Sequence, residues 1–211
     1  NGFLNIISLS NEFNVEKFVY ASSSSVYGSS KKIPFKESEK NLSPISLYGS
    51  TKLSNENIAN LFYEKFKLNS IGLRFFTVYG PLGRPDMAYF QFANKIKNNK
   101  TITVFNEGKM SRDMTYVDDI CDGIIKSLKV KLNKSKIFNL GNNHPIKLFD
   151  LIHFLEDSFR KKADIIYETS LDEIKNTQGD ISKAEKILNY DPKTSFEDGM
   201  KSFYDWFKKY E

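Results

Sequence analysis

Short apolar runs alternate along the chain with longer segments in which apolar residues recur every three or four positions. The short runs are typical of buried strands, and the longer segments are typical of helices that cover a sheet. The predicted strands are residues 17–21, 70–76, 101–105, 136–140 and 164–168. The predicted helices are residues 2–13, 48–66, 87–98, a helix that begins near residue 117, 147–161, 182–188 and 196–209. This alternation predicts an α/β fold with a mostly parallel sheet and helices on both faces.

Two further features of the pattern concern loops. Residues 79–86 and the polar segment that follows the strand at 101–105 are predicted to be loops, because glycine, proline and charged residues interrupt the apolar periodicity. No Gly-x-Gly-x-x-Gly turn follows an early strand. The usual phosphate cradle of a dinucleotide-binding domain is therefore missing from this sequence.

Composition narrows the class of protein. With 211 residues, of which 40% are hydrophobic, the chain can bury a core of one or two domains. We expect a cytoplasmic protein with no membrane partner, since the sequence has no apolar run of about 18 residues and no signal-peptide pattern. The single cysteine, Cys121, and the two histidines argue against a metal site. The net charge of +5 comes from dispersed lysines, so no nucleic-acid partner is expected.

Tyr48 and Lys52 stand four positions apart on a predicted helix, so their side chains share one face of it. Tyr27/Lys31, Tyr63/Lys67 and Tyr204/Lys208 have the same spacing, and a pair on a solvated surface is the ordinary interpretation of each. The context of Tyr48 is different, because it opens its helix and follows a serine run at the end of a strand. Open α/β sheets place their active sites at such strand ends.

A lysine ammonium beside Tyr48 would favour the deprotonated phenol. A free tyrosine titrates at about 10, and a cation about 4 Å away at an effective dielectric constant of about 20 contributes on the order of 4 kcal/mol. That energy corresponds to a pKa lower by about three, before the opposing effect of desolvation is subtracted. Tyr48 is therefore a candidate general base near neutral pH, assisted by Lys52.

Three stretches resemble a known family. They are residues 18–28 (FVYASSSSVYG), 44–52 (PISLYGSTK) and 72–88 (GLRFFTVYGPLGRPDMA). The first two look like the active-site half of extended short-chain dehydrogenases/reductases of the NAD-dependent epimerase/dehydratase family. The third is similar to the signature of the UDP-glucuronate 4-epimerases within that family. The resemblance covers nearly the whole chain.

The resemblance implies a fold, a cofactor and a substrate class. The chain would be the carboxyl-terminal part of a doubly wound, Rossmann-like parallel sheet with a smaller α/β substrate-binding domain, and it would use NAD and a UDP-sugar. Tyr48 would be the general base, Lys52 would also hold the nicotinamide ribose, and Ser23 would hydrogen-bond the reacting sugar hydroxyl. The other implied cofactor contacts are Ala21, Ser22, Phe75 and Phe76. The implied substrate contacts are Ser24, Ser25, Thr77, Arg84, Phe105, Arg112 and Glu173.

Arginine is scarce in this lysine-rich chain, and two arginines carry specific expectations. Arg84 lies in a Gly/Pro-rich loop and could bind the carboxylate of a uronic acid, which a neutral hexose lacks. The alternative for Arg84 is a surface salt bridge. Arg112 occupies the place where the family binds the nucleotide diphosphate, and its alternative is a structural ion pair with Asp113 or Asp118.

The resemblance also implies how the chain is divided and assembled. Residues 1–80 and 108–140 would form a partial NAD-binding domain, and residues 81–107 and 141–211 a nucleotide-sugar-binding domain. About a hundred residues, including the glycine-rich turn, would precede Asn1 in a complete enzyme. We therefore expect this polypeptide alone to bind NAD poorly and to be inactive. Helices 2–13 and 48–66 of two subunits would form a four-helix contact, which predicts a homodimer of the complete protein.

The leading functional interpretation is interconversion of UDP-glucuronate and UDP-galacturonate. Tyr48 would remove the proton from the hydroxyl at carbon 4 while hydride passes to NAD, and hydride would return to the other face of the 4-keto sugar. A UDP-glucose 4-epimerase is the nearest alternative, distinguished by Arg84 and Thr77. Dehydratases and uronate decarboxylases of the family usually carry an acidic residue where Ser25 stands, which argues against both of these functions. An inactive fragment that only binds nucleotide sugar, or that mediates pairing, is the alternative from another class.

Overall fold

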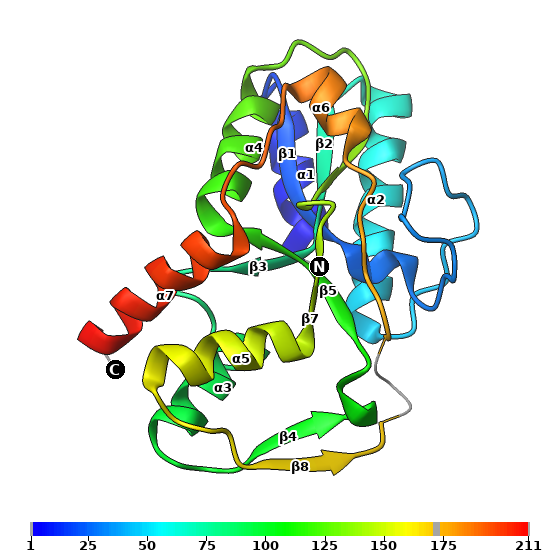
Figure 1. Ribbon diagram of the computed structural model, residues 1–211. Coiled ribbons are helices and arrows are strands. Elements are labelled where there is room, and N and C mark those ends of the chain that lie inside the picture. The colour runs from blue at the N-terminus through cyan, green and yellow to red at the C-terminus, as the bar shows by residue number, and fades with distance from the viewer. Residues whose placement is uncertain (1, 171–173, 211) are drawn as a thin grey trace.

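The computed structural model describes residues 2–170 and 174–210, and its central feature is a three-stranded parallel sheet (Figure 1). The strands lie in the order β1–β2–β6. Their bounds are Phe18–Ser23 for β1, Ser70–Phe75 for β2 and Lys136–Leu140 for β6. Phe18 pairs with Ser70, and Ile71 with Lys136. The carboxyl ends of the three strands therefore meet at one edge, where β1 runs directly into a short helical turn, η1 (Ser24–Tyr27).

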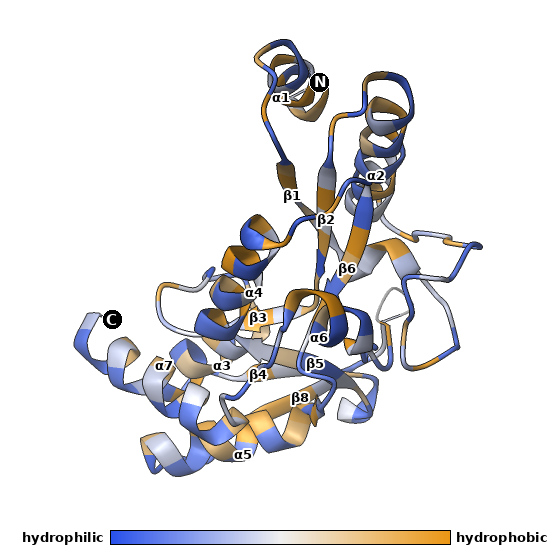
Figure 2. Cartoon of the chain, turned by 90° about the horizontal axis from the view of Figure 1, so that it is seen from above, coloured by the Kyte–Doolittle hydropathy of each residue, from blue (hydrophilic) through white to orange (hydrophobic). Residues whose placement is uncertain are grey.

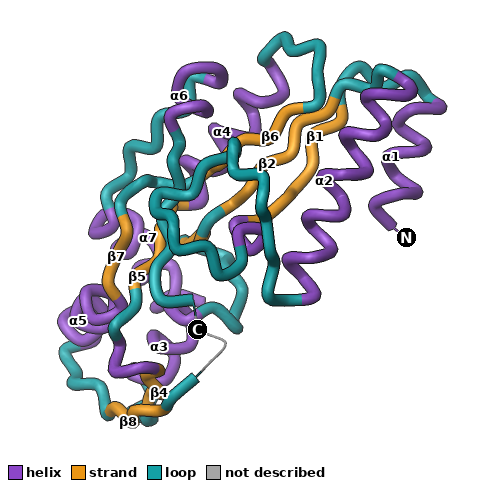
Figure 3. The backbone as a smooth tube through the Cα atoms, turned by 90° about the vertical axis from the view of Figure 1, so that its right-hand side faces the viewer, coloured by secondary structure: helices purple, strands orange, loops and turns teal. Residues whose placement is uncertain are grey.

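Helices cover both faces of this sheet. On one face, α1 (Gly2–Glu12) and α2 (Leu47–Phe66) lie side by side, and Ile7 and Ala59 pack against Tyr20 of β1 (Figure 3). On the other face, α4 (Val117–Lys129) and α6 (Ser182–Leu188) pack against Leu73 and Phe138. Figure 2 shows the sheet between α2 and α4. The middle strand β2 is almost entirely buried, as expected for a parallel strand between two helical layers.

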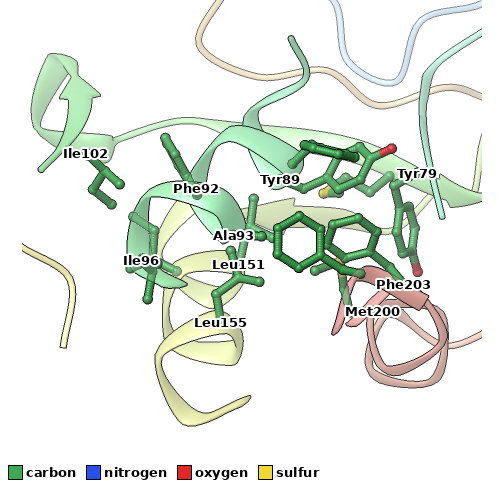
Figure 4. Packing of buried hydrophobic residues seen from close by; sticks show 14 of the residues in the cluster. Tyr79, Tyr89, Phe92, Ala93, Ile96, Ile102, Leu151, Leu155, Met200 and Phe203 are labelled. Atoms are coloured by element: carbon green, nitrogen blue, oxygen red, sulfur yellow. The ribbon is translucent and has the colours of Figure 1, made fainter. Parts of the chain in front are cut away.

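The remaining strands form two smaller sheets. In one, β3 (Thr77–Tyr79) pairs parallel with β5 (Ser111–Tyr116), which pairs antiparallel with β7 (Pro145–Lys147). In the other, β4 (Ile102–Phe105) pairs parallel with β8 (Ile165–Glu168), and a short turn, η2 (Asn106–Gly108), follows β4. Around them, α3 (Ala88–Lys97), α5 (Leu148–Phe159) and α7 (Phe196–Tyr210) enclose an aromatic-rich core. Figure 4 shows Tyr79, Tyr89 and Phe203 meeting in that core.

The predicted elements and the α/β fold class are confirmed, with element ends that differ by one or two residues. The prediction of a loop after residues 101–105 was wrong, because residues 111–116 of that segment form β5. The polar residues of this segment made it look like a loop in the sequence. In the structure, the buried Asp113 carboxylate accepts hydrogen bonds from the backbone N–H groups of Asn142 and Gly179, so a polar side chain is satisfied inside the fold. Within residues 2–170 and 174–210, the expected parallel sheet is one of three sheets. The residue boundaries of the two proposed domains stay predictions.

None of the described helices combines the length and apolar character that a membrane crossing requires. Within residues 2–170 and 174–210, no group of three or more His, Cys, Asp or Glu side chains is arranged to hold a metal ion.

Candidate active site

The first turn of α2 presents Tyr48 at the edge where β1 ends. The hydroxyl oxygen of Ser46 caps this helix by accepting the N–H of Gly49 at 3.0 Å. A Cβ atom on Gly49 would lie 2.7 Å from the carbonyl oxygen of Ser25, so only glycine lets the helix start this close to the serine run. Tyr48 itself is 55% exposed. Its ring is therefore accessible to a bound molecule.

Lys52 joins Tyr48 to the end of β1. Its Nζ lies 5.5 Å from the centre of the Tyr48 ring and donates a hydrogen bond of 2.9 Å to the carbonyl oxygen of Ala21. The pair Tyr63/Lys67 has nearly the same internal geometry, with Nζ 5.3 Å from the ring centre. Geometry within the pair thus does not distinguish Tyr48. What distinguishes Tyr48 is that its lysine, Lys52, is hydrogen-bonded to β1 at Ala21, two residues before Ser23.

The serine run follows directly. Ser23 is 8% exposed, and its hydroxyl accepts the N–H of Ser25 at 3.1 Å and lies 3.1 Å from the Ser25 hydroxyl. Ser24 and Ser25 are half-buried in η1. Ser22 is buried, and its hydroxyl donates to Glu56 of α2 at 2.5 Å. A cofactor contact from Ser22 would therefore have to come from its backbone.

Phe75 and Phe76 point to different surroundings. Phe75 is half-buried against the core beneath α4 and α6. Phe76 stacks near Phe35 and lines a cavity of about 310 Å³ together with Gly80 and Arg84. Thr77, the next residue, lines a second and larger cavity. The segment after β2 thus leads from the parallel sheet to both cavities.

The larger cavity has a volume of about 540 Å³. Three residues predicted to contact the substrate, Thr77, Phe105 and Arg112, line it together. In β4 the side chains alternate: Ile102 and Val104 are fully buried, while Thr103 and Phe105 line the cavity. An aromatic ring and a guanidinium in one cavity of this size fit a nucleoside diphosphate, whose base can stack and whose phosphates carry charge.

Sequence reasoning missed the part of this cavity that α3 forms. Met87, Gln91 and Lys95 all line it, and they stand four positions apart. That spacing places them on one face of the predicted helix, which was a usable signal. The direction in which this face points depends on how α3 packs against α5, and no local pattern shows that. Lys147, Leu148 and Leu151 complete the wall from β7 and α5.

Arg112 and Asp113 are adjacent in β5, but their side chains make contacts with different parts of the molecule. The Arg112 guanidinium lies at the cavity and donates through Nη1 to the carbonyl oxygens of Ser111 at 3.1 Å and Lys175 at 3.3 Å. The Asp113 carboxylate accepts backbone N–H groups of Asn142 at 2.6 Å and Gly179 at 2.8 Å. Burial raises the pKa of Asp113, although these backbone donors oppose the shift. Asp113 thereby ties β5 to the segments that follow β6 and precede α6.

Arg84 forms an ion pair with Asp86 of its own loop. Nε of Arg84 donates to one carboxylate oxygen at 3.0 Å, and Nη2 contacts the other. This pairing raises the pKa of Arg84 and lowers the pKa of the Asp86 carboxyl. The structure shows the surface salt bridge that the sequence left open, and the contact of Arg84 with a substrate carboxylate stays a prediction. Glu173 lies outside the described residues.

Comparisons with known proteins identify the family of this chain. A model of the NAD dependent epimerase/dehydratase family matches residues 1–141. The chain is 49% identical to protein MJ1055 of Methanocaldococcus jannaschii, with 98% of this chain and 63% of that protein covered. It is 39% identical to UDP-glucuronate 4-epimerase 4 of Arabidopsis thaliana, with 99% and 52% covered.

A solved structure is similar as well. The chain matches the UDP-glucuronic acid 4-epimerase of Bacillus cereus, in complex with UDP-glucuronic acid and NAD, with a TM-score of 0.92 and 34% sequence identity. That match covers 98% of this chain and 66% of the Bacillus enzyme. The chain thus spans between about half and two thirds of the length of these three proteins.

Proposed function

This chain belongs to the NAD dependent epimerase/dehydratase family, and we propose that the complete protein is a UDP-sugar 4-epimerase that interconverts UDP-glucuronate and UDP-galacturonate. The observation that carries the proposal is the group Tyr48, Lys52 and Ser23 at the carboxyl edge of the parallel sheet. Lys52 is held on Ala21 of β1 and lies over the ring of Tyr48, while Ser23 ends the same strand. A base, a cation that favours its ionised form and a hydroxyl partner are thereby brought to one edge.

Each of these residues has a task in the proposed reaction. The phenolate of Tyr48 removes the proton of the sugar hydroxyl at carbon 4 and returns it at the end of the cycle. The Lys52 ammonium stabilises the phenolate, and Ser23 orients the hydroxyl through a hydrogen bond. The 540 Å³ cavity holds the UDP part through Phe105 and Arg112, so the sugar can turn while the nucleotide stays in place.

The described residues fit the nicotinamide end of NAD. A lysine ammonium has three donors, and the hydrogen bond to Ala21 uses one of them, which leaves donors for ribose hydroxyls. When bound, NAD would supply an acceptor for the hydride of carbon 4 and a donor that returns it to the other face of the ring.

Tyr48→Phe in the complete protein tests the proposal. The ring stays and only the phenol oxygen is lost, so we expect turnover of UDP-glucuronate to fall at least about a hundredfold, with little change in UDP-sugar affinity. Turnover is followed by chromatographic separation of the two UDP-sugars, and affinity by calorimetry.

Tyr63→Phe is the matched control. Tyr63 is on the same helix, also has a lysine ammonium over its ring, and donates its hydroxyl to the carbonyl oxygen of Asn133, away from β1. This variant should keep near-normal turnover. If Tyr48→Phe keeps it as well, Tyr48 is not the base.

One observation favours a second candidate, a UDP-glucose 4-epimerase. The guanidinium of Arg84 already forms an ion pair with the carboxylate of Asp86. The positive charge of Arg84 therefore has a partner even when the sugar carries no carboxylate. Comparison of kcat/KM for UDP-glucuronate and UDP-glucose in the complete wild-type protein distinguishes the two candidates directly.

A further inference from the structure

Glu56 of α2 and Arg74 of β2 form an ion pair inside the layer beneath the candidate site. The two side chains are 7% and 3% exposed. Nε and Nη2 of Arg74 donate to the two carboxylate oxygens of Glu56 at 2.9 and 2.7 Å. Burying two charges has a large desolvation cost, and hydrophobic residues of similar size would often stabilise a fold as well. The burial of this ion pair is therefore weak evidence for a stabilising role, and its contacts indicate what else it does.

The pair contacts both ends of residues 22–27, the segment that contains the serine run. The Ser22 hydroxyl donates to Glu56 at 2.5 Å. At the other end, the guanidinium of Arg74 lies over the ring of Tyr27, 4.7 Å from its centre. Ser22 and Tyr27 flank Ser23, Ser24 and Ser25, the residues expected at the sugar. One ion pair thus holds the segment that carries these hydroxyl groups from both sides.

The same carboxylate is part of the helix that carries the candidate base. Glu56 follows Lys52 by four positions and Tyr48 by eight, so successive turns of α2 carry all three. Lys52 contacts Ala21 and Glu56 contacts Ser22, so two successive turns of the helix are joined to two successive residues of β1. A shift of α2 along β1 would break both contacts.

We propose that Glu56 is a positioning residue: fixed by Arg74, its carboxylate sets the separation between the Tyr48 hydroxyl on α2 and the Ser23 hydroxyl on β1. This inference rests on the proposed function, in which one sugar hydroxyl must meet both groups. Glu56 itself touches neither sugar nor cofactor. Because a displacement of about 1 Å at a reacting centre can cost on the order of a hundredfold in rate, a contact that fixes this separation acts on turnover.

The 540 Å³ cavity proposed to hold the UDP part makes it possible to distinguish a positioning role of Glu56 from a role in stability alone. Its walls come from β3, α3, β4, β5, β7 and α5, and Glu56 does not line it. A change at Glu56 should therefore act on kcat and leave the binding of UDP-sugar, and with it KM, nearly unchanged. A residue that only stabilises the fold would change the folded fraction and leave kcat per folded molecule as it is.

The test uses Glu56→Gln in the complete protein, assayed well below its unfolding temperature. Gln keeps the shape but presents an amide to Arg74. We expect kcat to fall about 10- to 100-fold with KM for the UDP-sugar within about threefold of wild type. Ser22→Ala is the second variant, because it keeps the ion pair and removes only its link to the serine run. It should lower kcat by about tenfold, and it remains informative if Glu56→Gln does not fold.

Glu156→Gln is the matched control. Glu156 of α5 is 8% exposed and is also paired, with Lys162 at 3.0 Å and the N–H of Ala163 at 2.8 Å. The Glu156→Gln variant should be less stable than wild type but should have the same kcat per folded molecule. If Glu56→Gln and Glu156→Gln show the same kcat per folded molecule, or if Ser22→Ala stays within about twofold of wild type, the positioning role is refuted.

Hydrogen exchange measured by mass spectrometry gives a readout that does not depend on the reaction. Glu56→Gln should speed amide exchange in residues 22–27 and leave β4 unchanged. Unchanged exchange in residues 22–27 would overturn the inference. If the wild-type protein has no epimerase activity, the proposed function is refuted. If Glu56→Gln nevertheless shows the expected faster exchange, the contact of Glu56 with the serine run is still supported.

Discussion

Arg84 is the residue whose side chain bears on the choice between a uronic acid and a neutral sugar. Asp86 uses the edge of the guanidinium made by Nε and Nη2, and a guanidinium has a second edge made by Nη1 and Nη2. If that edge binds the substrate carboxylate, Arg84→Ala should lower kcat/KM for UDP-glucuronate by roughly 10- to 150-fold, the range for a charge-assisted hydrogen bond. UDP-glucose should be almost unaffected. Steady-state kinetics with both sugars measures the difference.

Asp86→Ala is the control for this prediction, since it keeps the guanidinium and removes its partner in the loop. It should change kcat/KM for UDP-glucuronate by less than about fivefold, because exposed ion pairs contribute little. Equal losses for both sugars in Arg84→Ala would contradict the carboxylate contact. A uronic acid oxidised at carbon 4 is a β-keto acid, which can lose its carboxylate as carbon dioxide when no side chain holds it. Arg84→Ala should therefore also release some decarboxylated 4-keto pentose and leave an equal amount of the cofactor reduced, and mass spectrometry detects the pentose.

At this scale the sequence predicted Tyr48, Lys52 and Ser23 as a group, because their types, spacing and context lie in two short stretches. It did not indicate Glu56, whose partners Ser22 and Arg74 are distant along the chain. A glutamate in the third turn of a polar helix is most often exposed, and only its burial and its contacts with β1 and β2 distinguish it.

Among the elements, α4 depends on a residue outside itself. Nζ of Lys17 donates to the carbonyl oxygens of Leu128 at 2.7 Å and Val130 at 2.5 Å, at the end of the helix where carbonyl groups have no partner within it. The ammonium also interacts favourably with the negative end of the helix dipole. Lys17→Ala should therefore destabilise the protein by about 1 kcal/mol and lower Tm by about 2–4 °C, measured by calorimetry.

Lys129→Ala is the comparison at the same end of α4, since Lys129 lies in the last turn of the helix itself. It should shift Tm by less than Lys17→Ala does. A larger shift for Lys129→Ala would mean that the contact of Lys17 contributes little.

Element prediction succeeded where one face of a helix or strand is apolar and failed where burial depends on polar contacts. α2 was predicted from its apolar period almost to its ends. β3 and β7 have three residues each, too few to show a period, and β5 carries Arg112, Asp113 and Thr115. These three strands nevertheless pair in one sheet and connect the parallel sheet to the 540 Å³ cavity.

On the scale of the whole molecule, α1 presents an apolar stripe to solvent. Ile6 and Leu9 of α1 are 56% and 46% exposed, Phe13 in the turn directly after α1 is 73% exposed, and Leu61 on the adjacent α2 is 49% exposed. Exposed apolar side chains gathered on neighbouring helices are typical of a protein interface. We expect the complete protein to be a homodimer through α1 and α2, and Ile6→Glu to make it monomeric at micromolar concentration, as measured by light scattering after size exclusion.

Ile125→Glu is the control for the assembly prediction. Ile125 on α4 is 48% exposed and lies on the other side of the sheet from α1. This variant should remain dimeric. A wild-type protein that is monomeric at micromolar concentration would show that the stripe on α1 is not a self-association surface.

The sequence by itself determined the order of helices and strands, the α/β class, and the positions of the candidate base, its lysine and the serine run. Those features depend on neighbours within a few residues, whose spacing repeats with the period of the element. Only the tertiary structure decided which of several Tyr/Lys pairs touches β1, that Arg84 faces Asp86, that Glu56 meets Arg74 inside the fold, and that α3 and α5 close the 540 Å³ cavity. These are mostly contacts between segments distant in sequence, and even the pairing of Arg84 with Asp86 depends on the fold of its loop; no local period encodes which side chain will lie opposite which.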